Sequence, residues 1–559
     1  MDIITEFVHQ FEKYIGGKEN TAPQAYIDFI CGSLESDLSW FKNQKLLKLS
    51  LNAADKGLLH KLEASQLSLL KKKTGACLQR HPTYSHNIVF ALGLSGFSDR
   101  RWCLFLIKKM LVPYIRAATS QNNYPAAIAI ENLLYNQVIN KNEASGLFGE
   151  IYPVLVPLLE ECGRTAQHEI KLPPPSVHNK KKKTEIIWVV SEESMLAHTT
   201  VMSEMLRVLQ SGGQTQYEFK VISLIGKHEG FRIKLRSLGV ELISLEGTTI
   251  MGIFELRKYC STSCTDVIIW VSYPVGMVFA YAMRIAPVQI WLSMKHHDLK
   301  SKHIDAYLTG GSLEEYKTIN GRPWRNLRAS MSNLLDMSKK EEAHRIRRDE
   351  FSKFKKIILT IGRAAKLNSP PFLKSVTAVL KNNKDTAFLW ASRHQDPDIQ
   401  RVFDENDVAD QCFFLGWVDP LLYVHLADVY LDCFPFPSGL VAMQAMAASK
   451  PIVFYSSEDS LRTGVPGIVM SGLKSKDVIL RNQLETIFCP TEPRQADLFP
   501  AAKTPLEYEA FADELLRDEQ KCQDVGAANA NFARQFLSND DAFSKSFMQH
   551  ISELISEKA

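Results

Sequence analysis

The chain has 559 residues, which is too long for one hydrophobic core of ordinary size, so we expect two or three domains. Apolar residues make up 45% and charged residues 23%, a composition that excludes a disordered chain, and the net charge of +4 gives no argument for a nucleic-acid partner. The ten cysteines include no CxxC pair and no metal-ligand spacing, which predicts free thiols in a reducing compartment.

The N-terminal sequence, Met-Asp-Ile-Ile-Thr-Glu-Phe, carries acidic residues and no basic segment followed by an apolar one. A secretory signal needs that order of charge and apolarity. No uninterrupted apolar run is long enough to cross a bilayer. The sequence therefore predicts a cytoplasmic protein without a transmembrane segment.

The first part of the chain has a helical pattern. Apolar residues recur at a spacing of three to four over 126–138 and 147–162, and strand-like alternation is absent. We predict an all-α domain over residues 1–172. Helix pairs stacked like a helical repeat would suit this length, but the segment contains no clean fixed-period repeat, so that arrangement stays open.

A linker is predicted at 173–184. It begins with the three prolines Pro173, Pro174 and Pro175, which neither continue a helix nor join a central strand. The lysine run Lys180–Lys183 follows, and its like charges repel one another. No aromatic residues interleave with the lysines, so we interpret the run as a solvated linker.

Beyond the linker, short apolar segments typical of buried strands alternate with helical patterns. In the first set they occupy 185–191, 219–224, 267–271 and 288–292, with a helix expected at 200–210; in the second set they occupy 356–362, 386–390, 411–415, 429–432 and 451–455. This alternation predicts two parallel sheets flanked by helices. The charged segment 338–355 separates the sets, so we predict an N-terminal lobe over 185–345 and a C-terminal lobe over 346–559, facing each other across a cleft.

The most informative segment is Ala427–Val453. A short buried strand, Val429–Cys433, is ended by prolines and Gly439, and a helical pattern begins at once. This geometry points the backbone N–H groups of Ser438, Gly439 and Leu440 into the crevice at the carboxyl end of the strand. A helix N-terminus at that position favours an anion, most simply a phosphate. The alternative is a packing turn that binds nothing.

Two cations follow the first strand of the second set, in Gly362-Arg-Ala-Ala-Lys366. Gly362 permits a tight turn, and Arg363 and Lys366 stand at the carboxyl end of their strand. A diphosphate leaving group gains negative charge as its bond to the sugar breaks, and cations stabilise that charge. Together with the turn at Ser438 in the same sheet, these residues predict a diphosphate site.

His198 lies between the first strand of the N-terminal lobe and the helix that follows it. In a loop at the carboxyl end of a strand, its imidazole can act as a general base or bind the acceptor or a donor phosphate. The alternative is that this segment only begins the helix, with Thr199 or Thr200 as the N-cap and His198 incidental.

The segment Lys295–Asp298 also follows a predicted strand. Its residues His296, His297 and Asp298 could pair as base and orienting group, or line the wall of the cleft that faces the acceptor or donor. Adjacent histidines point in different directions and no third ligand follows at the right spacing, which argues against a metal site. The alternative is a polar surface loop.

Taken together, these segments resemble glycosyltransferase family 41, most closely the bacterial cytoplasmic N-glycosyltransferases of high-molecular-weight adhesins and more distantly the protein O-GlcNAc transferases. The matching stretches are the first-strand loop Val189–Thr200, the "LAPIQ" strand in Ser272–Leu292, the "FIDY" segment at His303–Tyr307, the lysine-bearing loop Lys366–Pro370, and the "CD-FLNPFPF" strand at Ala427–Phe436. They occur in the family's order.

The resemblance implies a GT-B fold, a UDP-hexose donor, no cofactor or metal, and transfer to a protein side chain. It also implies a functional role for His198 and a donor-phosphate role for Lys366. The chain departs from the family after Phe436, where a shorter turn lacks the Asn-Thr-Asn-Gly loop and Ala442 stands near the position of an acidic residue. The segment 416–422 also lacks the family's histidine-rich pattern, so the ribose and sugar contacts are not carried over.

We therefore predict a cytoplasmic GT-B glycosyltransferase that moves a hexose from a UDP-sugar to an Asn, Ser or Thr side chain of an adhesin-like polypeptide. Its partners would be a nucleotide sugar and a polypeptide acceptor. Two alternatives remain: a GT-B transferase acting on a glycan or lipid carrier, and a non-catalytic GT-B protein that scaffolds another transferase.

Overall fold

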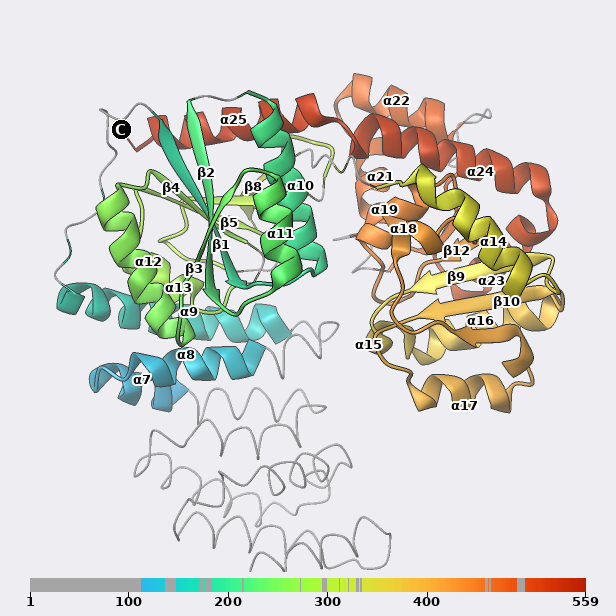
Figure 1. The fold of residues 1–559 in the computed structure, drawn as a ribbon, viewed down its shortest axis with the longest axis horizontal. Coiled ribbons are helices and arrows are strands. Elements are labelled where there is room, and N and C mark those ends of the chain that lie inside the picture. Colours follow the sequence, from blue (N-terminus) through green and yellow to red (C-terminus); the bar gives the residue numbers. More distant parts are fainter. Residues whose placement is uncertain are drawn as a thin grey trace, which may run out of the picture.

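A computed structural model describes two α/β lobes and part of the helical segment before them (Figure 1). The described residues are 112–135, 147–170, 172, 175, 183–213, 216–271, 273–293, 299–310, 312–319, 321–327, 331, 334–457, 461, 464–489 and 498–558. The remainder of the predicted all-α domain, and most of the predicted linker, lie outside these residues.

The N-terminal lobe is built on an 8-stranded sheet in the order β3-β2-β1-β4-β5-β6-β8-β7. Its strands are β1 (Thr184–Glu192), β2 (Tyr217–Ile225), β3 (Glu241–Ser244), β4 (Val267–Val271), β5 (Val288–Leu292), β6 (Ala306–Thr309), β7 (Tyr316–Ile319) and β8 (Arg322–Asn326). Neighbouring strands are parallel except for the hairpin of β7 and β8. Every residue of β4 and β5 is buried, as expected where helices cover both faces of a parallel sheet.

Helices on the two faces of this sheet follow from the alternation of side chains along β1. Trp188 faces a core shared with α10 (Ala197–Ser211) and α11 (Glu229–Ser237), whereas Ile187 faces a core shared with α12 (Thr249–Ser263) and α13 (Met277–Ala282). The side-chain period of two in a strand makes such a division inevitable when every position is apolar.

The described part of the helical segment consists of α7 (Val112–Ser120), α8 (Tyr124–Leu133) and α9 (Leu147–Ile170). Helices α8 and α9 lie where the helical pattern was predicted, and α9 continues past its predicted end at Cys162. Their apolar residues belong to the same core as α12 and α13 of the N-terminal lobe. The segment therefore packs against the N-terminal lobe, and Figure 1 shows it along the lower side of that lobe.

The C-terminal lobe contains a 6-stranded parallel sheet in the order β11-β10-β9-β12-β13-β14. Its strands are β9 (Lys356–Ile361), β10 (Thr386–Ala391), β11 (Cys412–Phe414), β12 (Val429–Leu431), β13 (Ile452–Tyr455) and β14 (Ala501–Ala502). One face carries α14 (Lys340–Glu350), α19 (Leu440–Ala447), α21 (Val465–Leu473), α22 (Val478–Phe488) and α24 (Glu519–Phe532); the other carries α16 (Pro370–Asn382), α17 (Pro397–Glu405) and α23 (Pro505–Arg517).

The last helix, α25 (Asp540–Ser556), crosses back to the N-terminal lobe (Figure 1). Its buried residues Phe543, Phe547 and Ile551 belong to the core around β1 and α10, and Phe547 stacks on Trp188 with ring centroids 5.7 Å apart. The prediction that 346–559 forms the C-terminal lobe is wrong for this helix. Its apolar stripe indicates a buried face but not which of two sheets covers it.

The boundary between the lobes also differs from the predicted position after residue 345. Helix α14 begins at Lys340, and its Ala343 is buried in the core of the C-terminal lobe together with Met331 and Leu334. The chain therefore enters the C-terminal lobe before the predicted boundary.

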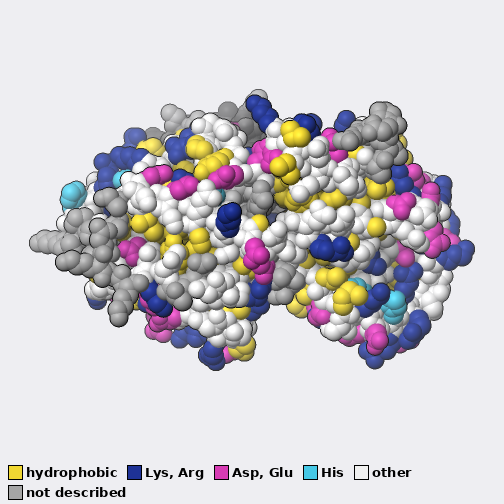
Figure 2. Space-filling view, turned by 90° about the horizontal axis from the view of Figure 1, so that it is seen from above, with side chains coloured by type: hydrophobic (Ala, Val, Ile, Leu, Met, Phe, Trp, Pro, Cys, Tyr) yellow, Lys and Arg dark blue, Asp and Glu magenta, His cyan; other side chains and the backbone are white. Residues whose placement is uncertain are grey.

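The segments that enter and leave the C-terminal lobe lie side by side, because the N–H of Met331 donates to the carbonyl oxygen of Leu537 at 2.7 Å. A direct contact between the lobes comes from Ser475, whose hydroxyl donates to Glu314 Oε1 at 2.7 Å. In Figure 2 the outline of the molecule narrows between the two lobes, and charges of both signs are interspersed over this face.

Strands predicted at 267–271 and 288–292 match β4 and β5 residue for residue, and the other predicted strands agree with the structure to within a few residues. The prediction of two Rossmann-like lobes in a GT-B arrangement is confirmed. The short strands β3, β6, β7, β8 and β14 were not predicted, because segments of two to five residues carry little periodicity. No helix among the described residues is long and apolar enough to cross a bilayer.

Candidate functional site

The site is built where two neighbouring strands of the C-terminal sheet end. Strands β9 and β12 are paired in parallel, so the loops that follow them emerge at the same edge. The first loop leads into the short helix α15 (Ala364–Leu367), and the second leads into α19. Lys366 Nζ donates to the carbonyl oxygen of Pro437 at 2.7 Å, so the two predicted phosphate-binding segments are in direct contact.

Ser438 does not offer a free amide. Its N–H donates to Asp432 Oδ1 at 2.6 Å, and its hydroxyl is 3.0 Å from the hydroxyl of Tyr430. The prediction that this N–H faces the cleft is wrong, because the buried carboxylate of Asp432 accepts its hydrogen bond. Ser438 therefore helps to shape the turn, and its amide does not face an anion.

Gly439 and Leu440 begin α19. Gly439 is the N-cap, it is exposed, and no side chain caps the helix. A Cβ atom added at Gly439 would meet no atom within 4 Å. The N-terminus of α19 therefore carries no side-chain cap, as the predicted anion site requires.

Asp432 was not singled out from the sequence. It directly follows β12 and is 1% exposed. Burial raises the pKa of its carboxyl to about 7, against hydrogen bonds from Ser438 and the positive charge of Lys366, which lower it. An acidic residue immediately after a buried strand and ahead of a proline-containing turn was the signal available in the sequence.

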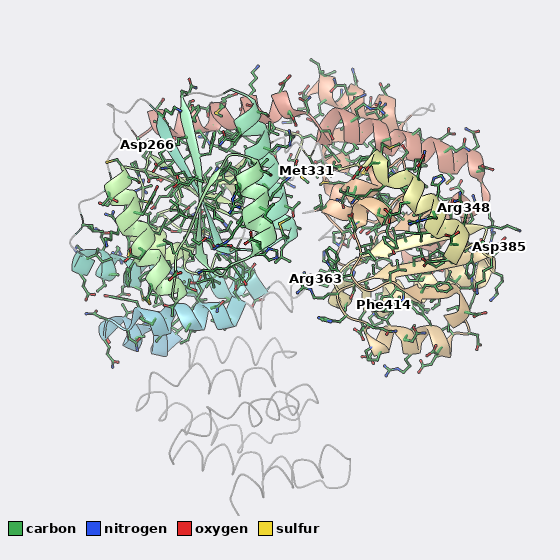
Figure 3. All side chains as sticks on the ribbon, viewed as in Figure 1. Asp266, Met331, Arg348, Arg363, Asp385 and Phe414 are labelled. Atoms are coloured by element: carbon green, nitrogen blue, oxygen red, sulfur yellow. The ribbon has the colours of Figure 1, made fainter. Side chains whose placement is uncertain are left out.

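Arg363 stands at the rim of the same edge. It is exposed, is the N-cap residue of α15, and lies on the side of the C-terminal lobe that faces the N-terminal lobe (Figure 3). Asp385, at the start of β10, lies on the opposite side of that lobe (Figure 3). The carboxyl ends of the strands thus face the N-terminal lobe, and Arg363 extends the positive charge of Lys366 toward it.

An aromatic side chain at this edge was also missed. Trp417 follows β11 and is 76% exposed, and the preceding Gly416 has a φ of 73°, a left-handed conformation that favours glycine. Such a turn projects the loop beyond the end of its strand. Since β11, β10, β9 and β12 are consecutive neighbours, Trp417 lies along the same edge as Lys366.

His198 lies in the first turn of α10, after β1, and is half-buried. The helix begins at Ala197, and Thr199 Oγ1 donates to the carbonyl oxygens of Ser194 and Leu196 at 2.7 and 2.9 Å. The alternative in which Thr199 or Thr200 is the N-cap is therefore wrong, because the helix starts before both.

The first turns of α10 are close to the C-terminal lobe. Val201, three residues after His198, packs against the core clusters of both lobes. This contact places the N-terminal end of α10 at the junction of the lobes, as the prediction of a cleft-facing His198 requires. Its chemical role stays a prediction.

The predicted wall residues Lys295, His296, His297 and Asp298 lie outside the described residues. Within the described part of the chain, no three His, Cys, Asp or Glu side chains gather in a way that could hold a metal ion.

Residues 355–479 match the family profile described as "Glycosyl transferases group 1". This range runs from the start of β9 into α22 and includes both loops of the site. The chain is a glycosyltransferase with a GT-B fold. The prediction of this enzyme class is thereby confirmed. A search of curated proteins gave no match.

A solved structure shows the same fold. A variant of the O-GlcNAc transferase from Thermobaculum terrenum superposes with a TM-score of 0.53 at 14% identity, covering 92% of this chain and 98% of that one. Two others have lower scores. HepE from Anabaena, in complex with UDP-glucose, has a TM-score of 0.47 at 11% identity over 66% of this chain and 99% of that one. TarM from S. aureus has a TM-score of 0.45 at 7% identity over 66% and 99%.

Proposed function

We propose that this glycosyltransferase moves a hexose from a UDP-sugar to a side chain of a polypeptide acceptor in the cytoplasm. The observation that carries the proposal is the contact between Lys366 and the loop that leads into the uncapped helix α19. One ammonium group and one open helix N-terminus meet at the edge of a glycosyltransferase lobe. This combination suits a diphosphate.

The donor diphosphate would lie over the two loops. Lys366 would exchange the Pro437 carbonyl oxygen for phosphate oxygens, and the amides of Gly439 and Leu440 would face the same anion. Arg363 would approach from the rim. When the bond between the anomeric carbon and the diphosphate breaks, the leaving UDP gains negative charge, which these groups stabilise in place.

On the opposite side, His198 is proposed to act on the acceptor. The acceptor nitrogen or oxygen forms a bond to the anomeric carbon as the bond to UDP breaks, and it loses a proton. An imidazole at the junction of the lobes can take that proton. The segment Lys295–Asp298 is proposed to line the same wall.

The polypeptide acceptor is supported by two considerations. The Thermobaculum protein is described as an O-GlcNAc transferase, and its match spans 92% of this chain, so it must extend into the part that precedes the two lobes. The described helices of that part are packed firmly on the N-terminal lobe. We propose that the helical domain presents the polypeptide to the cleft.

The donor assignment is tested by turnover of a panel of UDP-sugars, including UDP-glucose. We expect Lys366→Ala to lower kcat/KM about 100-fold or more, because a cation at a developing diphosphate charge stabilises the transition state. Lys374→Ala is the matched control, since Lys374 is exposed on α16 in the same lobe. Equal turnover by wild type and Lys366→Ala would contradict the phosphate assignment.

The acceptor is tested separately by mass spectrometry of adhesin-like peptides incubated with the enzyme and its donor. A hexose increment on an Asn, Ser or Thr side chain supports the proposal. Transfer only to glycan or lipid acceptors favours the first alternative. Failure to bind any nucleotide sugar, with stable co-purification of a second transferase, favours the scaffold alternative.

A further inference from the structure

The peptide unit between Pro437 and Ser438 joins two opposite charges. Its N–H donates to Asp432 Oδ1 at 2.6 Å, and its carbonyl oxygen accepts from Lys366 Nζ at 2.7 Å. A peptide dipole has its positive end at the N–H and its negative end at the carbonyl oxygen. Each end therefore meets the charge that it prefers, and hydrogen bonds to charged groups are the stronger kind.

The carboxylate end of this arrangement is fixed. The hydroxyl of Tyr508, on α23, donates to the main-chain oxygen of Asp432 at 2.9 Å, and the main-chain N–H of Asp432 donates to Val453 on β13 at 3.1 Å. Asp432 is 1% exposed, so water does not screen its charge. Asp432 thus fixes the position of the Pro437–Ser438 peptide through the Ser438 N–H, and that peptide holds Lys366 through the Pro437 carbonyl oxygen.

We propose that Asp432 is a positioning residue that holds Lys366 through the Pro437–Ser438 peptide and takes up a proton when the donor diphosphate binds. This inference rests on the proposed function, because it needs a diphosphate at Lys366. When the ammonium group turns to the diphosphate, the carboxylate loses its counter-charge and gains a nearby anion. Both changes favour the neutral acid.

Few other groups face this carboxyl. Among the described residues they are Lys366 on α15, Tyr430 on β12, Cys433 in the turn and Tyr508 on α23. Burial raises the pKa of both tyrosines well above the ordinary value and that of Cys433 to about 12. None of these three groups changes charge near neutral pH. Asp432 does, because burial raises the pKa of its carboxyl to about 7.

The diphosphate raises the pKa of Asp432 above its value in the free protein, so binding is strongest below the free value and weakens as the pH rises through the bound value. We expect the Kd for UDP-glucose to rise about tenfold between pH 6 and pH 8.5. A diphosphate that is esterified at both ends does not itself titrate in this range.

The test is calorimetry of UDP-glucose binding to the full chain at pH 7, in buffers of different ionisation enthalpy. We expect the wild type to take up as much as about half a proton per site, since the carboxyl is about half protonated beforehand. Asp432→Asn should take up none, and its Kd should be independent of pH. Tyr508→Phe is the matched control, because it removes a hydrogen bond to Asp432 without changing the charge, and its proton uptake should persist.

The outcomes distinguish failure of the Asp432 role from failure of the donor site. Binding without proton uptake in the wild type, or equal uptake in Asp432→Asn, overturns the role of Asp432 and leaves the donor site standing. Absence of binding at any pH by UDP-glucose and by every other UDP-sugar of the panel overturns the proposed donor and, with it, this inference. If Asp432→Asn does not fold, the pH dependence of the wild type and of Tyr508→Phe provides the test: a Kd for UDP-glucose that stays constant between pH 6 and pH 8.5 overturns the proposal.

Discussion

At the scale of single residues, a second buried carboxyl ties the helical segment to the N-terminal lobe. Glu131 on α8 is fully buried; its Oε2 accepts from the N–H of Gly276 at 2.8 Å and its Oε1 from the Tyr152 hydroxyl at 3.3 Å. Burial raises its pKa to about 8. The folded protein therefore holds this group protonated at a pH where the unfolded chain has ionised it.

This difference makes a stability prediction. Because the folded-state pKa is the higher one, the contribution of Glu131 is complete below its unfolded pKa of 4.5 and is lost as the pH rises through about 8. We expect Glu131→Gln to unfold at a higher temperature than the wild type at pH 8.5, with a gain of about 1–3 kcal/mol, and to show no such gain at pH 4.5. Glu161→Gln, at an exposed position of α9, is the control. A gain that is equal at both pH values would contradict the assignment.

At the scale of elements, the closest packing lies between α9 and α13. Gly163 of α9 faces α13, where a Cβ atom would collide with the Phe279 carbonyl oxygen and the Ala282 side chain. Every residue of α13 is buried, so neighbouring elements enclose this helix. The approach of the two helices therefore requires a glycine at position 163.

Two glycines of the same helix give a matched pair of variants. Gly163→Ala should destabilise the protein by about 1–3 kcal/mol through overpacking. Gly149→Ala, where a Cβ would meet nothing within 4 Å, should stabilise it by up to about 1 kcal/mol through helix propensity. Midpoints of urea unfolding measure both. If the two substitutions had the same sign, the packing of α9 on α13 would not be as described.

At the scale of the whole molecule, α25 links the lobes. It leaves the C-terminal lobe beside Met331 and covers Trp188 with Phe547. Arg325 of β8 pairs with Glu553 on the same helix. The N-terminal sheet therefore needs α25 to complete its core. The chain passes from the N-terminal lobe to the C-terminal lobe and then returns to the first.

We expect Phe547→Ala to lower the free energy of unfolding by about 3–5 kcal/mol, the usual cost of removing a buried aromatic side chain. Lys545→Ala, at an exposed position of α25, should have little effect. Limited proteolysis and urea unfolding check both variants. If Phe547→Ala were as stable as the control, α25 would not complete the core of the N-terminal lobe.

Much of the fold could be predicted from residue patterns. Runs such as Val267–Val271 are apolar at every position, which indicates inner strands of parallel sheets, and their alternation with helices predicts two such sheets. The site was predicted less completely. Lys366 and Gly439 were predicted as neighbours because loops after parallel strands share an edge, whereas Asp432 and Trp417 were not singled out because their burial or exposure depends on neighbours far away in the sequence.

The sequence by itself determined the two lobes, the positions of their main strands along the chain, and the edge at which the Lys366 loop and the α19 turn lie. Each of these depends on local periodicity and on the rule that parallel strands end at one side of a sheet. Only the tertiary structure decided that α25 packs on the N-terminal lobe and that the Ser438 amide donates to Asp432. The apolar stripe of a helix does not show which sheet will cover it. A buried carboxylate accepts a hydrogen bond from a nearby N–H because leaving its charge without one would cost several kcal/mol.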